Sequence, residues 1–566
     1  MSAPLPSKMP PISSKCKTPI FAINSIRLHI GVLLMLGLFC ATSMRVNMSM
    51  AVVCMVNETA YERERPSIWV NGSEVLSDYH PSCAASVADS GDSAVASGYA
   101  GTLLWTPKQI SLLLSATFYG GLVTTWWSGT LADRVGPKMT LLFGVLDCVV
   151  VTALTPFLAE RSFVALFVAR LIMGLGEGFI FPSISSMSAR WFPPQERSTF
   201  AAIYTSGNQL ASVLGLPLAS ALCGTTFLGG WPSIFYVFSV LGISWCILWT
   251  VITSNSPDAN KFISTEEMLY IHEQTAGHLA KKSGSSKLST TKIPWIRLLT
   301  SLALFANLVA QISFNFSAAL LQSYLPTYTM QVLRVPLSQN GIYTMLPFLT
   351  QMISKNIFGI LSDSLKKKGH ISDTMAVKVF QVSGNLGAAC CFMVLAFFVD
   401  CTTKPLAMLA LAFYGIFFSA GICGFFTSQL SIAPPFTGTV MSISMLFGTI
   451  GNAASPGLVG LLNKYGSEAE WRVIWILTAV INVIAGTFYL FFGTAEIQDW
   501  AKPAVLPSDK NAQPEASSDS DLEVYKTAYM TPDELEAIKN AMPTKADISR
   551  PGRTRRISDI SKSDFP

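Results

Sequence analysis

Long apolar runs separated by polar loops recur along most of the chain. Each run is long enough to cross about 30 Å of hydrocarbon as an α-helix. We predict twelve spans, at 27–54, 107–131, 138–158, 162–189, 198–223, 231–253, 298–325, 339–361, 375–399, 404–428, 435–462 and 472–494. The pattern therefore predicts an all-α polytopic membrane protein with twelve transmembrane helices in two sets of six.

Polar segments mark the boundaries around these two sets. The predicted organisation is a cytosolic N-terminal segment at 1–26, an N-terminal six-helix half at 27–253 with a large loop at 57–105, a central cytosolic loop at 254–297, a C-terminal six-helix half at 298–494 and a cytosolic tail at 495–566. Because the tail is rich in Ser, Asp, Pro and Lys, we expect most of it to be disordered.

A short motif recurs at equivalent places in the two halves. "GTLADRVGPK" at 129–138 follows the second span, and "GILSDSLKKK" at 359–368 follows the eighth. Two copies at matching positions indicate duplicated, pseudo-symmetric bundles. The glycines permit close helix approach, and the acids can hold cations in one orientation of the halves and release them in the other. We assign this gating role to Gly129, Asp133, Arg134, Gly136, Gly359 and Asp363.

The loop charges predict an orientation. Lys and Arg gather in the N-terminal segment, the central loop and the short loops at 132–138 and 366–368, whereas the 57–105 loop is mainly acidic. By the positive-inside rule, both termini are cytosolic. The 57–105 loop also holds sequons at Asn57 and Asn71, which suit glycosylation on the lumenal or extracellular face.

Composition agrees with a lipid-embedded chain and narrows its partners. Half of the 566 residues are hydrophobic and only 13% are charged, whereas soluble domains carry about 25% charged residues. The net charge of +5 is spread over the loops, so no nucleic-acid partner is expected. The eleven cysteines lack metal-ligand spacing, and most fall in apolar runs, so we expect neither a metal nor another cofactor.

Ionisable residues inside the predicted spans mark a candidate transport path, because charge at membrane depth is costly and faces a cavity or a partner. Arg45 lies in the first span. Arg170 and Glu177 lie seven residues apart, and so on one face, in the fourth. An arginine can bind an anion bidentately, and a buried glutamate can exchange a proton. The alternative for Arg170 and Glu177 is a structural ion pair.

Four further polar residues belong to this picture. Asn47 and Tyr119 complete the candidate substrate-binding set with the two arginines. For Asp147 in the third span, helix packing and function are equally good interpretations. Lys355 precedes Asp363 by eight residues, so we expect it to snorkel to the cytosolic face.

The remaining patterns indicate a secondary transporter rather than an enzyme. The sequence contains no nucleophile–base arrangement, no metal triad and no Walker-type loop that would bind ATP. A remote alternative is a non-transporting receptor or scaffold that recruits partners through its tail, where "RRIS" at 555–558 offers a phosphorylation site at Ser558.

Several motifs resemble a known family. "GTLADRVGPK" is similar to the loop signature of the major facilitator superfamily, and "MRVNMSMAVVCMVN" (44–57), "GLGEGFIFPSISSM" (174–187), "WFPPQERS" (191–198), "LPTY" (325–328) and "GTAEIQDW" (493–500) resemble the solute carrier family 17 anion transporters. The resemblance covers about residues 27–500 and implies the major facilitator fold. It also implies that Arg45 recognises organic anions and that Glu177, paired in the motif with Arg170, couples transport to protons.

Three departures limit what the resemblance implies about the substrate. Met173 stands where sialin-like members carry an acid, Phe314 stands where the glutamate carriers have an arginine, and 428–431 read "SQLS" where both carry N-H-L-D. These changes argue against a vesicular glutamate transporter and leave the individual anion open.

We therefore predict a secondary transporter of small organic anions, coupled to H+ and working by alternating access. The alternative is a sodium-dependent cotransporter of inorganic phosphate. The sequence is compatible with the plasma membrane and with a lysosomal or vesicular membrane.

Overall fold

The computed structural model describes residues 24–57, 67–70, 73–76, 101–193, 196–272, 294–369, 371–433 and 436–501. The predicted modification sites Asn71 and Ser558 lie outside these residues, as do the side chains of Asp133 and Asp363. The described helices belong to one compact unit that ends at Lys502.

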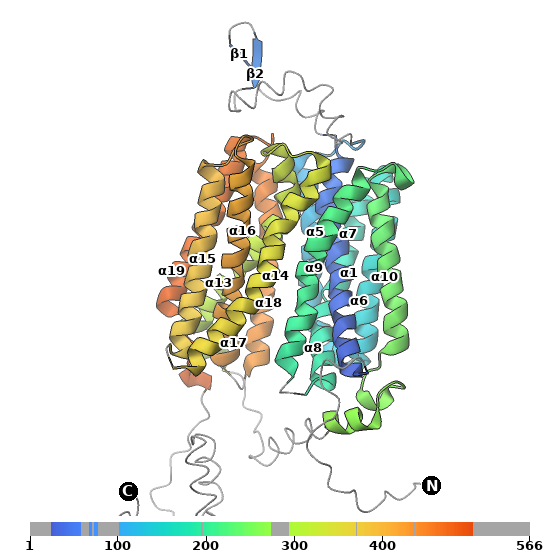
Figure 1. Ribbon diagram of the computed structural model, residues 1–566, viewed down its shortest axis with the longest axis vertical. Coiled ribbons are helices and arrows are strands. Elements are labelled where there is room, and N and C mark those ends of the chain that lie inside the picture. Colours follow the sequence, from blue (N-terminus) through green and yellow to red (C-terminus); the bar gives the residue numbers. More distant parts are fainter. Residues whose placement is uncertain are drawn as a thin grey trace, which may run out of the picture. The chain divides into compact units, whose positions relative to one another are not determined.

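Long helices make up both halves of the molecule (Figure 1). The N-terminal half contains α1 (Ile26–Met55), α5 (Pro107–Val135), α6 (Pro137–Arg161), α7 (Phe163–Glu177), α8 (Ile180–Trp191), α9 (Arg197–Cys223) and α10 (Pro232–Ile252). The C-terminal half contains α13 (Leu302–Gln331), α14 (Leu337–Lys367), α15 (Asp373–Phe397), α16 (Lys404–Gly421), α17 (Thr427–Ser431), α18 (Thr437–Leu462) and α19 (Glu468–Phe492). The π-helical turn η3 (Ile422–Phe426) joins α16 to α17.

Short elements connect these helices. They are the 3₁₀ turns η1 (Phe227–Gly229), η2 (Pro257–Ala259) and η5 (Asp499–Ala501), the helix α12 (Trp295–Leu299), and the strands β1 (Ser67–Val70) and β2 (Ser73–Leu76). The strands form an antiparallel hairpin in which Ser67 pairs with Leu76. For the residues that the structure describes, the prediction of an all-α protein therefore holds apart from this hairpin in the 57–105 loop.

Nine helical segments within the described ranges are long and apolar enough to span a membrane. Three more predicted spans correspond to α5, α9 and α14, which have 29, 27 and 31 residues but are less apolar. These three helices pack across the interface between the halves, α9 against α14 and α5 against α18. Polar side chains are tolerated there because they face protein rather than lipid. Long helices thus occupy all twelve predicted places, and nine of them meet the apolarity criterion.

The helices run between two ends of the bundle (Figure 1). We call the end where α1 begins and α19 ends the basal end, and the end where α1 ends and α5 begins the apical end. Figure 1 shows the N-terminal half on the right and the C-terminal half on the left.

Local sequence signals set several helix starts at these ends. Thr106 and Gln109 form a reciprocal capping box at the start of α5, with Pro107 in the first helical position. Ser467 and Glu470 form the same arrangement at the start of α19. Each box satisfies backbone N–H groups that have no partner inside the helix.

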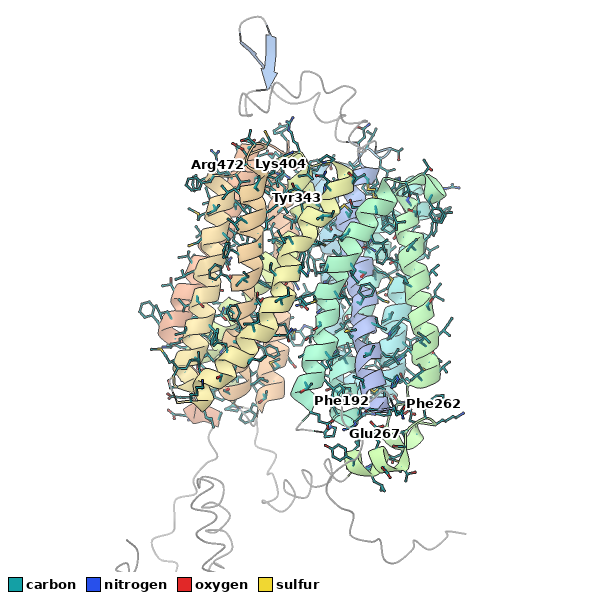
Figure 2. The ribbon with its side chains drawn as sticks, viewed as in Figure 1. Phe192, Phe262, Glu267, Tyr343, Lys404 and Arg472 are labelled. Carbon is teal, nitrogen blue, oxygen red and sulfur yellow. A yellow bond between two sulfur atoms is a disulfide. The ribbon has the colours of Figure 1, made fainter. Side chains whose placement is uncertain are left out.

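An ion cluster ties the segment after α10 to the basal end of α1. The buried guanidinium of Arg27 contacts Glu267 at 2.8 Å and Glu196 at 2.6 Å. Tyr270 donates a 3.0 Å hydrogen bond to Glu196, and its ring lies 4.8 Å from the guanidinium carbon of Arg27. Figure 2 shows Glu267 beneath the basal end of the N-terminal half. The first part of the predicted central loop is therefore a packed structural element, helical over 265–272.

The Glu267 carboxylate is held in its charged form. Burial alone would raise its pKa, but hydrogen bonds from the Arg27 side chain, from Ser25 and from the backbone N–H groups of Arg27 and Ile26 outweigh burial and lower the pKa.

Candidate functional site

Arg45 lies on α1 with partners from three other helices. Its Nη1 is 2.6 Å from Oε1 of Glu177 at the end of α7. Its Nη2 donates a 3.2 Å hydrogen bond to Oε1 of Gln322 on α13, which belongs to the other half. The guanidinium carbon lies 5.4 Å from the centre of the Phe118 ring on α5, within cation–π distance. Arg45 therefore links the two halves near the middle of the bundle.

Glycines allow the helices around Glu177 to approach closely. A Cβ added at Gly174 would lie 2.1 Å from the backbone oxygen of Thr117, so α7 and α5 are in backbone contact there. α7 ends at Glu177, and a turn at Gly178 and Phe179 separates it from α8. A Cβ at Gly178 would meet Thr124 Oγ1 at 2.0 Å. The glycine-rich sequence thus permits both the close packing and the break that position the Glu177 carboxylate.

Arg170 is buried beside this pair and is incompletely satisfied. Its side chain is 1% exposed. Nη1 donates to the backbone oxygen of Met44 at 3.4 Å and lies 3.6 Å from the sulfur of Met173. Within the part of the chain that the structure describes, its Nε and Nη2 have no hydrogen-bond partner. The structural ion pair considered for Arg170 and Glu177 is not formed, because Glu177 pairs with Arg45 instead.

A small cavity, open to solvent, brings the two arginines together. Its wall includes Arg45, Arg170, Thr117 and Phe118 from the N-terminal half, and Gln322 and Ser323 from the C-terminal half. Sequence reasoning missed the last four residues. An amide in an apolar span was a usable signal for Gln322, whereas Phe118 is indistinguishable in sequence from a core residue.

Two predicted binding residues lie elsewhere. Tyr119 is 36% exposed and is not part of the cavity wall, because Phe118, one residue earlier, takes that direction. Asn47 is buried on the other face of α1, where its Oδ1 would lie 3.6 Å from a Cβ at Gly215 of α9. Side chains two positions apart on an α-helix point about 200° away from each other, so Asn47 and Arg45 cannot share one face.

Asp147 fits one of the two interpretations given for it, whereas Lys355 differs from expectation. Asp147 packs against the backbone of Gly176, where an added Cβ would lie 2.3 Å from its Oδ2. This close contact fits the helix-packing interpretation. Lys355 does not reach the basal end, because its Nζ donates a 2.7 Å hydrogen bond to Thr205 Oγ1 on α9.

The structure explains one glycine of the repeated loop motif and shows no close packing at two others. Gly136 has φ +104°, a conformation that favours glycine, and it packs against Asn255, whose Oδ1 accepts from the backbone N–H of Lys138 at 3.0 Å. Among the described residues, no atom lies within 4 Å of a Cβ added at Gly129 or Gly359, so the expected close helix approach is not seen there. Arg134 is exposed.

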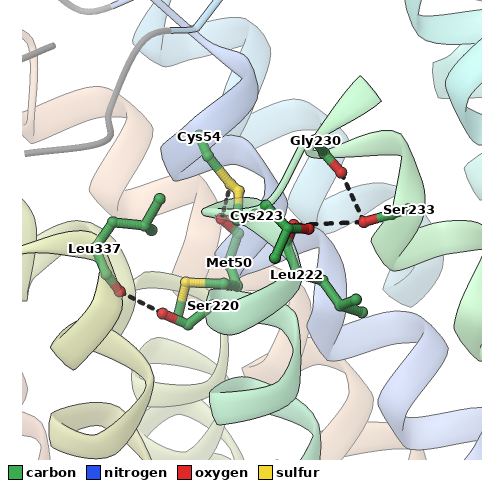
Figure 3. The surroundings of a disulfide bond; sticks show 9 residues. Met50, Cys54, Ser220, Leu222, Cys223, Gly230, Ser233 and Leu337 are labelled. Carbon is green, nitrogen blue, oxygen red and sulfur yellow. Dashed lines mark hydrogen bonds between the residues drawn. A yellow bond between two sulfur atoms is a disulfide. The ribbon is translucent and has the colours of Figure 1, made fainter. Parts of the chain in front are cut away.

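The apical end carries covalent and polar links (Figure 3). A disulfide joins Cys54 at the end of α1 to Cys223 at the end of α9, with Cα atoms 6.5 Å apart. Nearby, Ser220 donates a hydrogen bond to the backbone oxygen of Leu337, which begins α14 in the other half. The predicted sequon residue Asn57 lies just beyond α1 and donates a backbone hydrogen bond to Leu103.

Comparison with known proteins identifies the family to which this chain belongs. The model of the Major Facilitator Superfamily matches residues 33–451. The chain belongs to the major facilitator superfamily. It is 35% identical over 497 residues to the uncharacterized transporter slc-17.3 of Caenorhabditis elegans, covering 86% of this chain and 91% of that protein. It is 32% identical over 482 residues to sialin of Homo sapiens, covering 84% and 91%.

A solved structure confirms the fold. The D-xylose-proton symporter superposes with a TM-score of 0.57 at 14% sequence identity, covering 83% of this chain and 99% of that chain. The major facilitator fold predicted from the resemblance is confirmed, and so is membership of the solute carrier family 17 group. This member of the superfamily is therefore a polytopic membrane transporter with the two-arginine cavity between its halves.

Proposed function

We propose that the protein is a proton-coupled secondary transporter of small organic anions. The observation that carries the proposal is the charge balance of the cavity: two guanidiniums, Arg45 and Arg170, line it, and only Arg45 has a bonded carboxylate among the described residues. A buried cation without a counter-ion is costly, so the cavity favours an anionic ligand. A carboxylate can receive bidentate hydrogen bonds from a guanidinium.

The Arg45–Glu177 contact supplies a coupling mechanism. While Glu177 is charged, it occupies the Arg45 guanidinium at 2.6 Å. A proton on Glu177 removes that charge and leaves Arg45 available to a substrate carboxylate. Substrate and proton are then bound together, and release of the proton restores the competing ion pair and favours release of the anion. Gln322 bonds the same guanidinium from the C-terminal half, so a change at Arg45 affects the contact between the halves.

We propose that the apical end faces the lumen or the extracellular space and that both termini are cytosolic. Disulfides persist in oxidising compartments. The Cys54–Cys223 disulfide lies at the apical end, and Cys401, in the loop between α15 and α16 at the same end, is also disulfide-bonded. The plasma membrane and an acidic organelle membrane both fit this orientation.

The test is uptake into proteoliposomes with proton, sodium and voltage gradients imposed separately. We expect an inward proton gradient to drive uptake of at least one sugar carboxylate or amino acid from a panel that also contains inorganic phosphate. R45A should abolish this uptake. E177Q should lose acceleration by the proton gradient while it retains anion exchange between the two sides. Sodium-driven phosphate uptake, or saturable anion uptake by R45A, would overturn the proposal.

A further inference from the structure

We propose that Lys355 of α14 is a second binding station for the transported anion, contributed by the C-terminal half on the basal side of Arg45. This inference rests on the proposed anion transport and adds a residue to its path. The Lys355 side chain is half-buried, and its Nζ donates a 2.7 Å hydrogen bond to Thr205 Oγ1 of α9. The contact therefore spans the interface between the two halves.

Among the residues that the structure describes, the Lys355 ammonium has only a neutral partner. Thr205 Oγ1 donates its own hydrogen bond to the backbone oxygen of Ala201 at 2.7 Å, so its oxygen accepts the hydrogen bond from the Lys355 ammonium. An ammonium has three N–H donors, and this contact uses one of them. None of the ion pairs formed by the described residues includes Lys355. The two other donors are suited to a mobile anion.

Lys355 lies between the basal end and the arginine cavity. Thr42 of α1 donates a 2.8 Å hydrogen bond to Asn208 of α9, which aligns the two helices at that level. Arg45 is three residues apical of Thr42, and Thr205 is three residues basal of Asn208. At 1.5 Å per residue, Lys355 therefore contacts α9 about 9 Å closer to the basal end than the Arg45 backbone.

The spacing gives an anion two successive cationic partners. A side chain of Lys or Arg reaches several ångströms from its backbone, so an anion can leave Arg45 toward Lys355 without crossing the apolar layer unpaired. A purely structural Lys355 would hold α14 against α9 through its hydrogen bond. A glutamine could preserve a hydrogen bond to Thr205, but not the charge.

The experiment measures passage of charged probes past Lys355. A reporter cysteine replaces Gln322 in the full-length chain, in which the exposed Cys390 is changed to serine. A sulfonate-bearing methanethiosulfonate reagent and its trimethylammonium counterpart are applied from the basal side of sealed vesicles, and the parent without the reporter is subtracted. The ratio of the two labelling rates is compared with and without K355Q.

We expect K355Q to lower the anion-to-cation rate ratio by about threefold to tenfold, because one positive charge is removed from the path. K355R should keep the ratio. K378Q on α15, a helix that packs against α16 and α19, is the matched control and should also keep it. An unchanged ratio in K355Q would overturn the proposal. This readout needs no substrate, so it stands apart from the uptake assay that decides the proposed function.

Discussion

Three arginines of the N-terminal half, of which Arg27 and Arg170 are buried and Arg45 is partly exposed, differ in the groups that balance their charge. Within the described part of the chain, Arg27 contacts two carboxylates and Arg45 contacts one, whereas Arg170 has only a backbone oxygen and a sulfur as hydrogen-bond acceptors. A fully paired buried arginine is typical of a structural cluster, because each carboxylate offsets its desolvation. An unpaired one in a cavity is typical of a ligand site. The number of contacting carboxylates, which falls from Arg27 to Arg170, thus distinguishes the structural ion cluster from the candidate binding site.

Glu267 permits a pH-dependent test of the scaffold cluster. Its lowered pKa means that it stabilises the fold fully above its ordinary value of about 4.3, and that this stability is lost as the pH falls through the lowered pKa. E267Q should lower stability by about 1–3 kcal/mol at pH 7, because the charge-assisted bonds to Arg27 are lost. The measurement is the apparent melting temperature of purified protein from pH 7 to pH 3.

The neighbouring residue provides the control for that prediction. Glu266 is exposed, and E266Q should leave the melting temperature unchanged at pH 7. The difference in melting temperature between the wild type and E267Q should become smaller only at acidic pH. A difference that is already absent at pH 7 would show that the cluster does not hold the segment after α10 to α1.

At the scale of the helices, backbone contact between α5 and α7 sets the position of the site. A Cβ at Gly120 would lie 2.1 Å from the backbone oxygen of Leu171, which cannot move aside as a side chain can. G120A should therefore push the helices apart and cost about 1–3 kcal/mol. At Gly121 the nearest atom to an added Cβ is 3.7 Å away, so G121A is a matched control. The two variants are compared by thermal unfolding. Equal melting temperatures would show that the backbone contact at Gly120 does not limit how closely α5 and α7 pack.

The helices themselves were predictable because length and apolarity are local properties of the sequence. The three less apolar helices also fell in predicted places, since they remain long and lie between clear loops. The pairing of Arg45 with Glu177 was not predictable in the same way. Arg170 and Glu177 lie in one helix, α7, but the partner of each depends on how α7 packs against α1.

The residues that the C-terminal half contributes could not be predicted from the sequence for a related reason. Gln322 and Lys355 are single polar residues in apolar helices, and their roles depend on which residues of the other half they face. Snorkelling was a reasonable expectation for Lys355 in a helix surrounded by lipid. In the structure α14 packs against α9, so a hydroxyl of the other half is closer than the end of the helix.

At the scale of the whole molecule, the apical end holds the halves together. Ser111 at the start of α5 donates a 2.6 Å hydrogen bond to the backbone oxygen of Pro456 on α18, and Ser220 bonds Leu337. Backbones also meet closely, because a Cβ at Gly341 of α14 would lie 2.6 Å from the Pro217 Cα of α9. Alternating access requires these contacts to separate when the apical end opens.

A cross-link across this interface tests whether the separation is necessary. A Cβ at Gly460 would lie 2.2 Å from that of Ser111, so S111C combined with G460C brings two thiols within reach after a small shift. Oxidation of the double variant should abolish uptake by holding the apical end closed, whereas each single variant should be insensitive to oxidant. A bond within one half, such as Cys54–Cys223, leaves the halves free to move relative to each other. Undiminished uptake by fully cross-linked protein would rule out apical opening at this interface as part of the transport cycle.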